Sequence, residues 1–582
     1  MTALDWAIVA LYFVASAAVG VYYTKRAGSN VQEFFLSGRN LPWWLAGTSM
    51  VATTFAADTP LAVTELVAKN GIAGNWLWWN MAVGGVLTVF FFARLWRRAG
   101  IMTDVEFVEL RYSGRPAAFL RGFRALYVGL FMNCVVMAWV NLAMASILEG
   151  MFSIPRGQVL LYVGLSLTVT ALYLALSGLW GVAVTDAFQF LLAMAGTIVL
   201  AVVVLPQVGG VAGLEARLPE WAVRFAPAIG EPPGTGGAGG VLALSLGAFL
   251  AFVAVQWWSS WYPGAEPGGG GYIAQRMMSA KDEKHSLFAT LWFTIAHYCV
   301  RPWPWILVGL ATLVLYPELG PADKRLGYVF AMRDHLPAGL KGMLVASFFA
   351  AYMSTIATQL NWGTSYVVND FYKRFLRRDA GERELVLLSR GTTLLLMVVS
   401  LLATPLLTTI EGAWAFILQA SAGLGLVLIL RWFWWRINAW SEIAAMAAAF
   451  LTYGVVDRGG VTFPETLYYI VGVSTAAWVL VTLVTPPADR ATLEGFYRRV
   501  HPGGPGWGPV ARSLPDVKGD TGLGWLFADW AAGVVLVYSM LFAVGRLIFG
   551  DYAQGLLLIA VGAVAAGVIY WDLSRRGFRE VE

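Results

Sequence analysis

The chain has 582 residues, of which 58% are hydrophobic and only 13% are charged, and its formal net charge is +5. Soluble proteins carry about 25% charged residues, so this composition excludes an ordinary soluble domain and indicates a polytopic membrane protein. The 27 tryptophans suit the interfacial belts and tight packing of a helix bundle. The two cysteines are too few for a disulfide framework.

Fifteen hydrophobic segments are long enough to cross a bilayer, which takes about 20 residues as a helix. In chain order they are 3–24, 41–68, 72–93, 122–151, 157–177, 181–206, 241–279, 286–315, 338–366, 388–409, 412–434, 439–456, 465–485, 526–549 and 552–573. The sequence therefore predicts an all-α polytopic membrane protein with about 15 transmembrane helices.

The positions of Lys and Arg predict the orientation, because these residues favour cytoplasmic loops. With the N-terminus outside, 29 of the 40 Lys and Arg residues face the cytoplasm, 10 face outside, and Arg301 lies within a segment. We therefore expect a multi-pass protein of the cell inner (plasma) membrane, with its N-terminus outside and its C-terminus cytoplasmic.

The second segment, residues 41–68, is interrupted near its middle by Asp58 and Pro60. A proline inside a helix removes a backbone donor and clashes with the preceding turn. In lipid, the backbone groups freed by such a break are tolerated only beside a cavity or inside protein. The interruption therefore predicts a buried or cavity-lining site.

The seventh segment, residues 241–279, is interrupted by a run from Trp261 to Gly271 that contains Glu266, Pro267 and four glycines. The two interrupted segments lie five segments apart, and this odd number places them in opposite orientations. Such pairs of broken helices are typical of inverted-repeat transporters, which bind substrate and ion at the bilayer midplane.

The eighth segment carries two polar side chains, His297 and Arg301. A charged residue in the membrane is costly, so Arg301 is expected to face protein. It either binds a carboxylate substrate or pairs with an acid such as Glu149 or Glu266. His297 lies about one turn earlier, and we interpret it as a packed histidine rather than a proton relay.

The ninth segment carries small and hydroxyl residues on one helical face, at Ala351, Ser354, Thr355, Thr358 and Asn361. One interpretation is close helix packing with interhelical hydrogen bonds. The other is an alkali-cation site, because Na⁺ takes oxygen ligands and the free carbonyls of a neighbouring broken helix supply more of them.

Two connecting loops are long. Residues 207–240 are expected to face outside and to form an irregular cap. Residues 486–525 are expected to face inside, and their composition predicts a flexible linker. We find no nucleotide-binding, nucleic-acid-binding or kinase module, and no histidine paired with an acid or nucleophile at the midplane. The sequence thus favours neither an enzyme nor a nucleic-acid partner.

Several motifs resemble the sodium:solute symporter family. In chain order they are Phe34-Phe-Leu-Ser-Gly-Arg-Asn-Leu-Pro-Trp-Trp44, Ser49-Met-Val-Ala-Thr-Thr-Phe-Ala-Ala-Asp58, Thr185-Asp-Ala-Phe-Gln189, Gln275-Arg276, and Ser354-Thr355 with Asn361 and Asp370-Phe-Tyr372. They recur in the family's order and spacing and cover about residues 1–485. The resemblance implies a LeuT-type five-plus-five inverted repeat with extra N- and C-terminal helices.

This implied fold divides the chain into five regions. They are an extra N-terminal helix and cytoplasmic loop (1–40), the ten-helix transport core (41–435, with repeats of about 41–206 and 241–435), two additional helices (436–485), a cytoplasmic linker (486–525), and two C-terminal helices with a tail (526–582).

The resemblance also implies a Na⁺ site. Its ligands are expected to be the backbone carbonyls of Ala52, Phe55 and Ala351 and the hydroxyls of Ser354 and Thr355. Asp186 resembles a carboxylate on the inner route of the ion, the alternative being an acid at the membrane interface. A second Na⁺ site found in some members uses two adjacent hydroxyls. This chain has Ala357 and Thr358 there, which favours one Na⁺.

Substrate contacts are expected along both breaks and on the eleventh segment, at Thr54, Asp58, Thr59, Trp257, Trp258, Glu266 and Gln419. Tyr272 resembles an inner-gate aromatic by position, the alternative being an interfacial tyrosine. Sugar-transporting members resemble this pattern with Glu-Gln in place of Asp58-Thr59 and Asn-Gln in place of Gly270-Gly271. This departure leaves the solute unassigned.

The sequence therefore predicts a secondary active symporter that couples inward Na⁺ flow to uptake of a small polar organic solute by alternating access. Two alternatives remain. One is a proton-coupled transporter that uses Asp58 or Asp186. The other is a transporter-like membrane sensor, which would need a signalling domain that we do not find.

Overall fold

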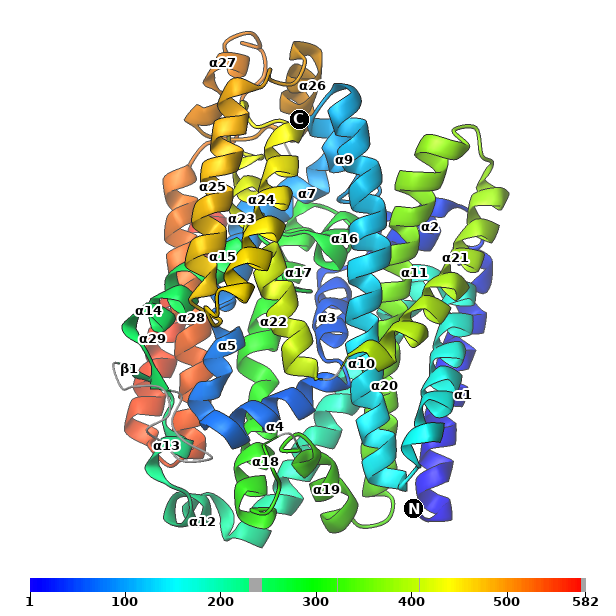
Figure 1. The fold of residues 1–582 in the computed structure, drawn as a ribbon, viewed down its shortest axis with the longest axis vertical. Helices are drawn as coiled ribbons and strands as arrows, with labels where there is room; N and C mark the ends of the chain where they lie inside the picture. The colour runs from blue at the N-terminus through cyan, green and yellow to red at the C-terminus, as the bar shows by residue number, and fades with distance from the viewer. Residues whose placement is uncertain (230–242, 322, 408, 577–582) are drawn as a thin grey trace.

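The computed structural model describes residues 1–229, 243–321, 323–407 and 409–576. Most of its helices run along the long axis of the molecule (Figure 1). Within the described residues the one sheet is a short parallel pair, β1 (Ala228–Ile229) with β2 (Ala243–Leu244). The all-α prediction is therefore confirmed.

The first half of the chain contains α1 (Ala3–Ala27), α2 (Val31–Leu36), η1 (Ser37–Arg39), α3 (Trp43–Thr54), α4 (Asp58–Asn70), η2 (Ile72–Asn75), α5 (Trp76–Trp79), α6 (Ala82–Leu87), η3 (Thr88–Phe92), α7 (Ala93–Ala99), α8 (Phe107–Arg111), α9 (Gly114–Leu126), η4 (Tyr127–Met132), α10 (Asn133–Phe152), α11 (Arg156–Val204), η5 (Leu205–Val208), α12 (Gly210–Arg217) and α13 (Glu220–Val223).

The second half contains α14 (Leu246–Leu250), η6 (Ala251–Gln256), α15 (Trp257–Ser259), α16 (Gly271–Ser279), α17 (Glu283–Ile295), η7 (Ala296–Val300), α18 (Pro302–Leu315), α19 (Leu326–His335), α20 (Leu340–Ser365), η8 (Tyr366–Leu376), α21 (Glu382–Ala403), η9 (Thr404–Leu406), α22 (Ile410–Ser421), α23 (Gly425–Leu430), α24 (Ala439–Arg458), α25 (Thr466–Val484), α26 (Arg490–Val500), η10 (Pro505–Trp507), α27 (Gly508–Ala511), α28 (Leu523–Ile548) and α29 (Tyr552–Arg576).

Eleven helices in the described residues are long and apolar enough to cross a membrane, so the predicted number of about fifteen is not confirmed. Three of the predicted segments, 41–68, 241–279 and 412–434, are divided into helices too short to be counted among these eleven. The segments 157–177 and 181–206 are two helices that meet at a kink at Gly178, within the element α11.

Gly178 bends α11 sharply, with φ 54° and ψ −162°. This conformation favours glycine because a Cβ atom is strained there. A Cβ at this position would also lie 3.1 Å from the Phe34 carbonyl oxygen. The bend therefore lets one element supply two helical stretches that both pack on the core.

The interrupted segment α3–α4 lies at the centre of the bundle (Figure 1). The helix α3 packs against α11, α17 and α20, while α4 packs against α10, α18 and α22. Because protein surrounds both halves, the backbone groups freed at the break face other helices rather than lipid.

Residues 486–525 are packed rather than extended. In α26, Phe496 stacks on Trp507, and the Trp507 ring nitrogen donates to the Trp432 carbonyl at 2.8 Å. Arg98, at the end of α7, pairs with Asp520 at 2.8 Å. The glycines and prolines predicted a flexible linker, but the aromatic residues among them bury against the ends of other helices.

Glu109 of α8 connects α9 to η8. Its carboxylate accepts hydrogen bonds from Arg121 of α9 and Arg374 of η8 at 2.7–2.8 Å. Burial alone would raise the pKa of Glu109, but the two guanidinium groups outweigh it and hold the pKa below its ordinary value.

The last two helices form a hairpin, and α28 packs against α6 and η7. Small residues allow the close approach, because a Cβ on Gly545 would lie 2.1 Å from the Trp303 ring and one on Gly533 2.6 Å from Val86. The ring nitrogen of Trp303 donates to the Leu541 carbonyl at 3.0 Å.

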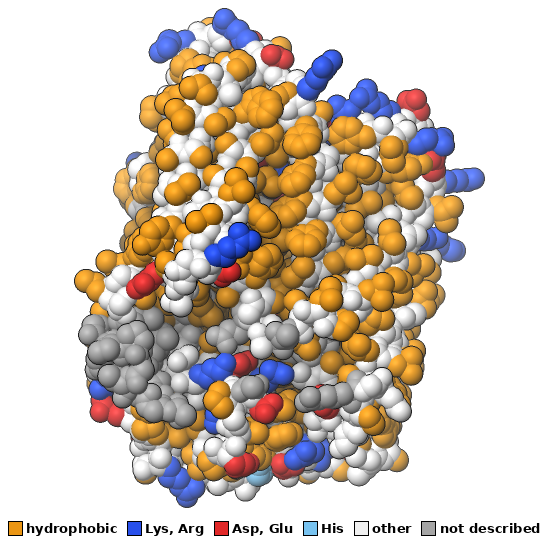
Figure 2. Space-filling view, viewed as in Figure 1, with side chains coloured by type: hydrophobic (Ala, Val, Ile, Leu, Met, Phe, Trp, Pro, Cys, Tyr) orange, Lys and Arg blue, Asp and Glu red, His pale blue; other side chains and the backbone are white. Residues whose placement is uncertain are grey.

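The surface fits a lipid environment. Figure 2 shows hydrophobic side chains over most of this face, with Lys and Arg at its upper end and others among acidic side chains in its lower part. The helices α26 and α27 lie at that end of the long axis, and α12 and α19 lie at the other (Figure 1). Many large apolar side chains on the long helices are exposed, as expected for helices that face lipid.

Candidate functional site

The first break separates α3, which ends at Thr54, from α4, which begins at Asp58. Phe55 leaves the helical conformation with φ −92° and ψ 66°. Pro60 stands near the start of α4, where its missing N–H has no helical partner to lose. The break therefore leaves Asp58 and Thr59 at the beginning of a new helix in the middle of the bundle.

The second break covers residues 260–270, between α15 and α16. Gly264, Gly268 and Gly269 have φ values of 87°, 73° and 68°, which is the region that favours glycine. A Cβ on Gly268 would also lie 2.9 Å from the Leu428 carbonyl oxygen. The glycine run thus lets the unwound chain pass close to α23.

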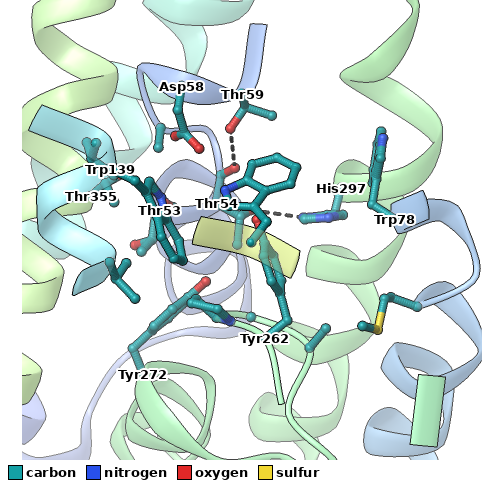
Figure 3. A pocket seen from close by; sticks show the side chains of 18 of the residues that line it. Thr53, Thr54, Asp58, Thr59, Trp78, Trp139, Tyr262, Tyr272, His297 and Thr355 are labelled. Atoms are coloured by element: carbon teal, nitrogen blue, oxygen red, sulfur yellow. Dashed lines mark hydrogen bonds between the residues drawn. The ribbon is translucent and has the colours of Figure 1, made fainter. Parts of the chain in front are cut away.

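A cavity of about 60 Å³ lies between the two breaks. Residues from α3, α4, α5, α10, the second break, α16, η7, α20 and α22 line it: Thr53, Thr54, Ala56, Asp58, Thr59, Val63, Trp78, Met81, Val136, Trp139, Val140, Tyr262, Pro263, Gly264, Ala265, Tyr272, His297, Tyr298, Arg301, Thr355, Gln359 and Trp414. Figure 3 shows Asp58 and Thr59 on one side of the cavity and Tyr262 and Tyr272 on the opposite side.

Thr54, His297 and Arg301 form one hydrogen-bonded group in the wall. The Thr54 hydroxyl oxygen lies 2.9 Å from His297 Nδ1 and accepts from Arg301 Nη1 at 3.1 Å. Arg301 also reaches His297 Nε2 at 2.9 Å and the His297 carbonyl at 3.1 Å. The described hydrogen bonds of Arg301 thus go to Thr54 and His297.

Asp58 is 2% exposed, and its Oδ1 atom has no hydrogen-bond partner among the described residues. Next to it, the Thr59 hydroxyl donates to the Thr54 carbonyl at 3.2 Å. A buried polar group normally has a partner, so Asp58 leaves an unfilled acceptor at the edge of the cavity.

Of the predicted substrate residues, Thr54, Asp58 and Thr59 line the cavity, whereas Trp257, Trp258, Glu266 and Gln419 do not. Trp257 packs on Trp530 of α28, and Gln419 accepts a hydrogen bond from Thr466 of α25. The predicted gate residue, Tyr272, lines the cavity and contacts the Trp362 ring.

Glu266 lies away from the cavity, over the glycines that follow it. A Cβ on Gly270 would come within 2.1 Å of its carboxylate and within 3.4 Å of the Asp104 carboxylate. The Gly271 N–H donates to Asp104 at 3.0 Å, which fixes the start of α16. Glu266 thus belongs to a charged cluster at the end of the second break.

The two adjacent hydroxyls of α20 face α3 and α11. Ser354 donates to Asp186 at 2.6 Å, and Thr355 donates to the Thr53 carbonyl at 2.7 Å. Asp186 also accepts from Ser49 at 2.5 Å. The predicted residues Ser354, Thr355 and Asp186 therefore meet at one place, next to the end of α3.

Arg276 of α16 completes this polar group. Its Nη2 atom donates to Thr358 at 2.7 Å and lies 3.8 Å from Asp186 Oδ2, while its Nε atom donates to Ser49 at 3.2 Å. The sequence identified Arg276 only as part of a motif. A signal was present in the sequence, because an arginine within a predicted membrane segment needs an acidic partner.

The carbonyls predicted as Na⁺ ligands lie at the same helix ends. Ala52 stands in the last turn of α3 and its carbonyl accepts from the Phe55 N–H at 3.0 Å. Phe55 is the first residue after α3, and Ala351 lies one turn before Ser354 and Thr355 in α20. Among the described residues no three His, Cys, Asp or Glu side chains gather as a metal site.

No sequence motif marks most of the residues of the cavity wall. Trp78, Trp139, Tyr262 and Trp414 line the cavity, yet aromatic residues are frequent throughout the chain. Their positions depend on how α5, α10 and α22 are rotated against the two breaks, and no motif marks that rotation.

Residues 34–449 match the model of the sodium:solute symporter family. The chain is similar to a sodium/mannose cotransporter from Bos taurus, with 26% identity over 77% of this chain and 78% of that protein. It is also similar to a sodium/glucose cotransporter from Vibrio parahaemolyticus, with 24% identity over 77% of this chain and 83% of that protein.

Among solved structures, the chain is similar to a Na⁺-coupled sialic acid symporter in a substrate-bound outward-open state. The TM-score is 0.68 at 18% sequence identity, over 84% of this chain and 99% of that one. At this identity the likeness concerns the fold.

Proposed function

Since the chain belongs to the sodium:solute symporter family and has the LeuT-type fold, we propose that it couples inward Na⁺ flow to uptake of a small polar organic solute by alternating access. Na⁺ is the co-transported ion. Each Na⁺ that enters a cell with an inside-negative potential releases about 2.3 kcal/mol per 100 mV, which can drive accumulation of the solute. Enzymatic activity is not part of the proposal.

We propose that Na⁺ binds between α3 and α20. Its ligands would be the carbonyls of Ala52, Phe55 and Ala351 and the hydroxyls of Ser354 and Thr355. The support is geometric, because Thr355 reaches the last turn of α3 at 2.7 Å and Ser354 reaches Asp186 at 2.6 Å. Both hydroxyl oxygens keep a lone pair for a cation. Asp186 would then serve the ion on its inner route.

The solute would bind in the cavity between the two breaks, with Thr54, Asp58 and Thr59 among its contacts. Tyr272 would close the cavity on the side of α16. Trp257, Trp258, Glu266 and Gln419 lie outside the lining and are not included. The cavity of about 60 Å³ is far below the ~300–1,000 Å³ of small-molecule sites. Its walls must therefore move apart to admit a solute.

One observation connects the proposed ion site to the proposed solute site. Thr355 lines the cavity and also donates to the carbonyl of Thr53 at the end of α3. The proposed ion ligand is thus part of the solute-site wall, so an ion that draws α20 toward α3 changes the shape of the cavity. A ligand shifts a conformational equilibrium only through such different contacts in the two states.

The orientation in the membrane is part of the same proposal and follows from the distribution of Lys and Arg. The N-terminus would lie outside and the C-terminus in the cytoplasm, with α26 and α27 on the cytoplasmic side. The core would cover residues 41–435, preceded by residues 1–40 and followed by the regions 436–485, 486–525 and 526–582.

The test is uptake by proteoliposomes of purified protein. An inward Na⁺ gradient should drive accumulation of the solute, and an equal K⁺ gradient should not. A proton-coupled mechanism through Asp58 or Asp186 is the alternative. It would be favoured if a pH gradient in Na⁺-free medium drove the same uptake, whereas a sensor would bind solute and Na⁺ without moving either.

A further inference from the structure

Arg301 is a buried positive charge with no acidic partner among the described contacts, and it lines the cavity. We infer that the transported solute carries a carboxylate that Arg301 binds, together with a hydroxyl or ammonium group that donates to Asp58. This inference rests on the proposed function, because it names the class of solute for the same cavity.

Other arginines of the bundle have their charge compensated by protein. Arg121 pairs with Asp370 at 2.7 Å, and both Arg124 and Arg431 pair with Glu442 at 3.0–3.1 Å. A buried charge is expected to be paired in this way. Arg301 differs because its contacts within the described residues are to a hydroxyl, an imidazole and a backbone carbonyl, which are all neutral.

A second buried arginine, which forms no ion pair among the described contacts, has its charge stabilised by backbone carbonyls. Arg111 donates to the backbone carbonyls of Arg431, Trp434 and Trp435 at 2.9–3.1 Å. These carbonyls lie at the end of α23, where a helix carries partial negative charge. Arg301 donates to one backbone carbonyl, that of His297, and its side chain lines a cavity.

The hydrogen bonds of Arg301 leave donors free. A guanidinium has five N–H groups and cannot accept. The Nε, Nη1 and Nη2 atoms of Arg301 each make one described bond, to the His297 carbonyl, to Thr54 and to His297 Nε2. Two N–H groups therefore remain, the number that one carboxylate accepts in a two-point contact.

His297 does not share the positive charge. Because arginine can only donate, His297 Nε2 must accept from Arg301 and carries no proton. Nδ1 then carries the ring proton and donates to the Thr54 hydroxyl. The Thr54 hydroxyl in turn donates to the Val51 carbonyl at 3.0 Å. This chain of bonds keeps His297 neutral and holds Arg301 in position against the cavity.

Asp58 is the acidic side chain of the described lining. No ion pair within 4.0 Å joins it to Arg301 in the described residues, although the two side chains interact electrostatically, and Asp58 Oδ1 has no hydrogen-bond partner there. A solute that carries both an acceptor and a donor group would contact both side chains. A hydroxy acid, a sugar acid or an amino acid supplies both complementary groups.

The aromatic wall strengthens the preference for such a solute. Trp78, Trp139, Tyr262 and Trp414 surround the two charges, and the Arg301 guanidinium lies 5.9 Å from the Trp78 ring centre. Charged contacts are stronger where water is excluded. A neutral polyol would satisfy hydrogen bonds here but would offer the Arg301 guanidinium no carboxylate.

The experiment compares carboxylic acids with neutral polar solutes of similar size. Purified wild-type protein in Na⁺ is tested with lactate, gluconate and alanine and with the neutral analogues lactamide and glucose, first for thermal stabilisation and then for uptake in proteoliposomes. We expect at least one acid to bind about 100-fold more tightly than its neutral analogue. If alanine is preferred to lactate the donor is an ammonium, and if gluconate or lactate is preferred it is a hydroxyl.

Arg301→Gln and Arg301→Lys then locate the contact. The preference for the acid over its neutral analogue should fall to within about three-fold in Arg301→Gln and be partly kept in Arg301→Lys. Arg217→Gln removes an exposed charge in α12 and should keep the full preference. Stabilisation by Na⁺ alone reports whether each variant is folded.

Three results would overturn the inference. They are binding of a neutral sugar as tight as that of its acid, no binding of any acid in the panel, or an unchanged preference in folded Arg301→Gln. Na⁺-driven uptake of a neutral solute would support the proposed symport but would contradict the inference that the solute carries a carboxylate. Uptake of an acid without any Na⁺ dependence would instead refute the symport.

Discussion

Removing the hydroxyls of Ser354 and Thr355 in α20 should weaken the activation of transport by Na⁺. Ser354→Ala with Thr355→Val deletes both proposed side-chain ligands and leaves the carbonyl ligands in place. A hydrogen bond to a charged group contributes about 1.5–3 kcal/mol, and we take about 1–2 kcal/mol for each lost oxygen. The Na⁺ concentration for half-maximal uptake should rise about ten-fold in each single variant and up to about 100-fold in the double variant, if the two effects add.

The assay is initial uptake in proteoliposomes over a series of Na⁺ concentrations, with Na⁺-dependent thermal stabilisation as a second measure. Thr355→Ser keeps the oxygen and should remain close to wild type. Ser347→Ala removes another buried hydroxyl of α20, one that donates to the Leu192 and Met343 carbonyls, and should leave Na⁺ activation unchanged. Wild-type Na⁺ dependence in the folded double variant would show that the ion binds elsewhere.

Three further changes test the site and the fold. Asp58→Asn should reduce solute affinity about ten-fold or more, as measured by solute titration at saturating Na⁺, and unchanged affinity would remove Asp58 from the solute site. Gly268→Ala should lower the melting temperature in detergent, because a Cβ meets the Leu428 carbonyl at 2.9 Å and φ is 73°; a wild-type melting temperature would contradict this geometry. The lowered pKa of Glu109 stabilises the folded state above about pH 4.3, its ordinary pKa, and this stabilisation is lost as pH falls through the lower folded value. Glu109→Gln should therefore melt lower than wild type at pH 7 and approach it as the pH falls below the folded pKa of Glu109, whereas a difference that does not change with pH would contradict the linkage.

The sequence predicted the two breaks because their cause is local. Proline, aspartate and consecutive glycines disrupt a membrane helix wherever they stand, and the structure has non-helical residues at 55–57 and 260–270. The shared face of Ser354 and Thr355 was equally local, since helical periodicity alone places them side by side.

Position along the chain was a poor guide to the cavity wall. Trp257 and Glu266 flank the second break, yet the unwound segment turns Glu266 toward Asp104, and α15 directs Trp257 toward α28. Trp139 and Trp414 come from helices far away in the sequence. These placements are set by tertiary packing, which a single sequence does not encode in any short pattern.

Residues 486–525 show the same limit of sequence-based prediction. Its glycine and proline content predicted flexibility, but Trp507 is 1% exposed and donates to the Trp432 carbonyl. Composition describes the average tendency of a segment. One large aromatic residue that finds a pocket outweighs that tendency, because burying it stabilises by about 2–3 kcal/mol.

The hairpin of α28 and α29 lies beyond residue 449, where the match to the family ends. Even so, α28 covers Trp303, and the Cys299 thiol contacts its Val537 carbonyl at 3.3 Å. Those residues flank Arg301 in the chain. A shortened version ending at residue 449 would expose this flank to detergent, so truncations designed for crystallisation should keep the hairpin even though it lies beyond the residues that match the family.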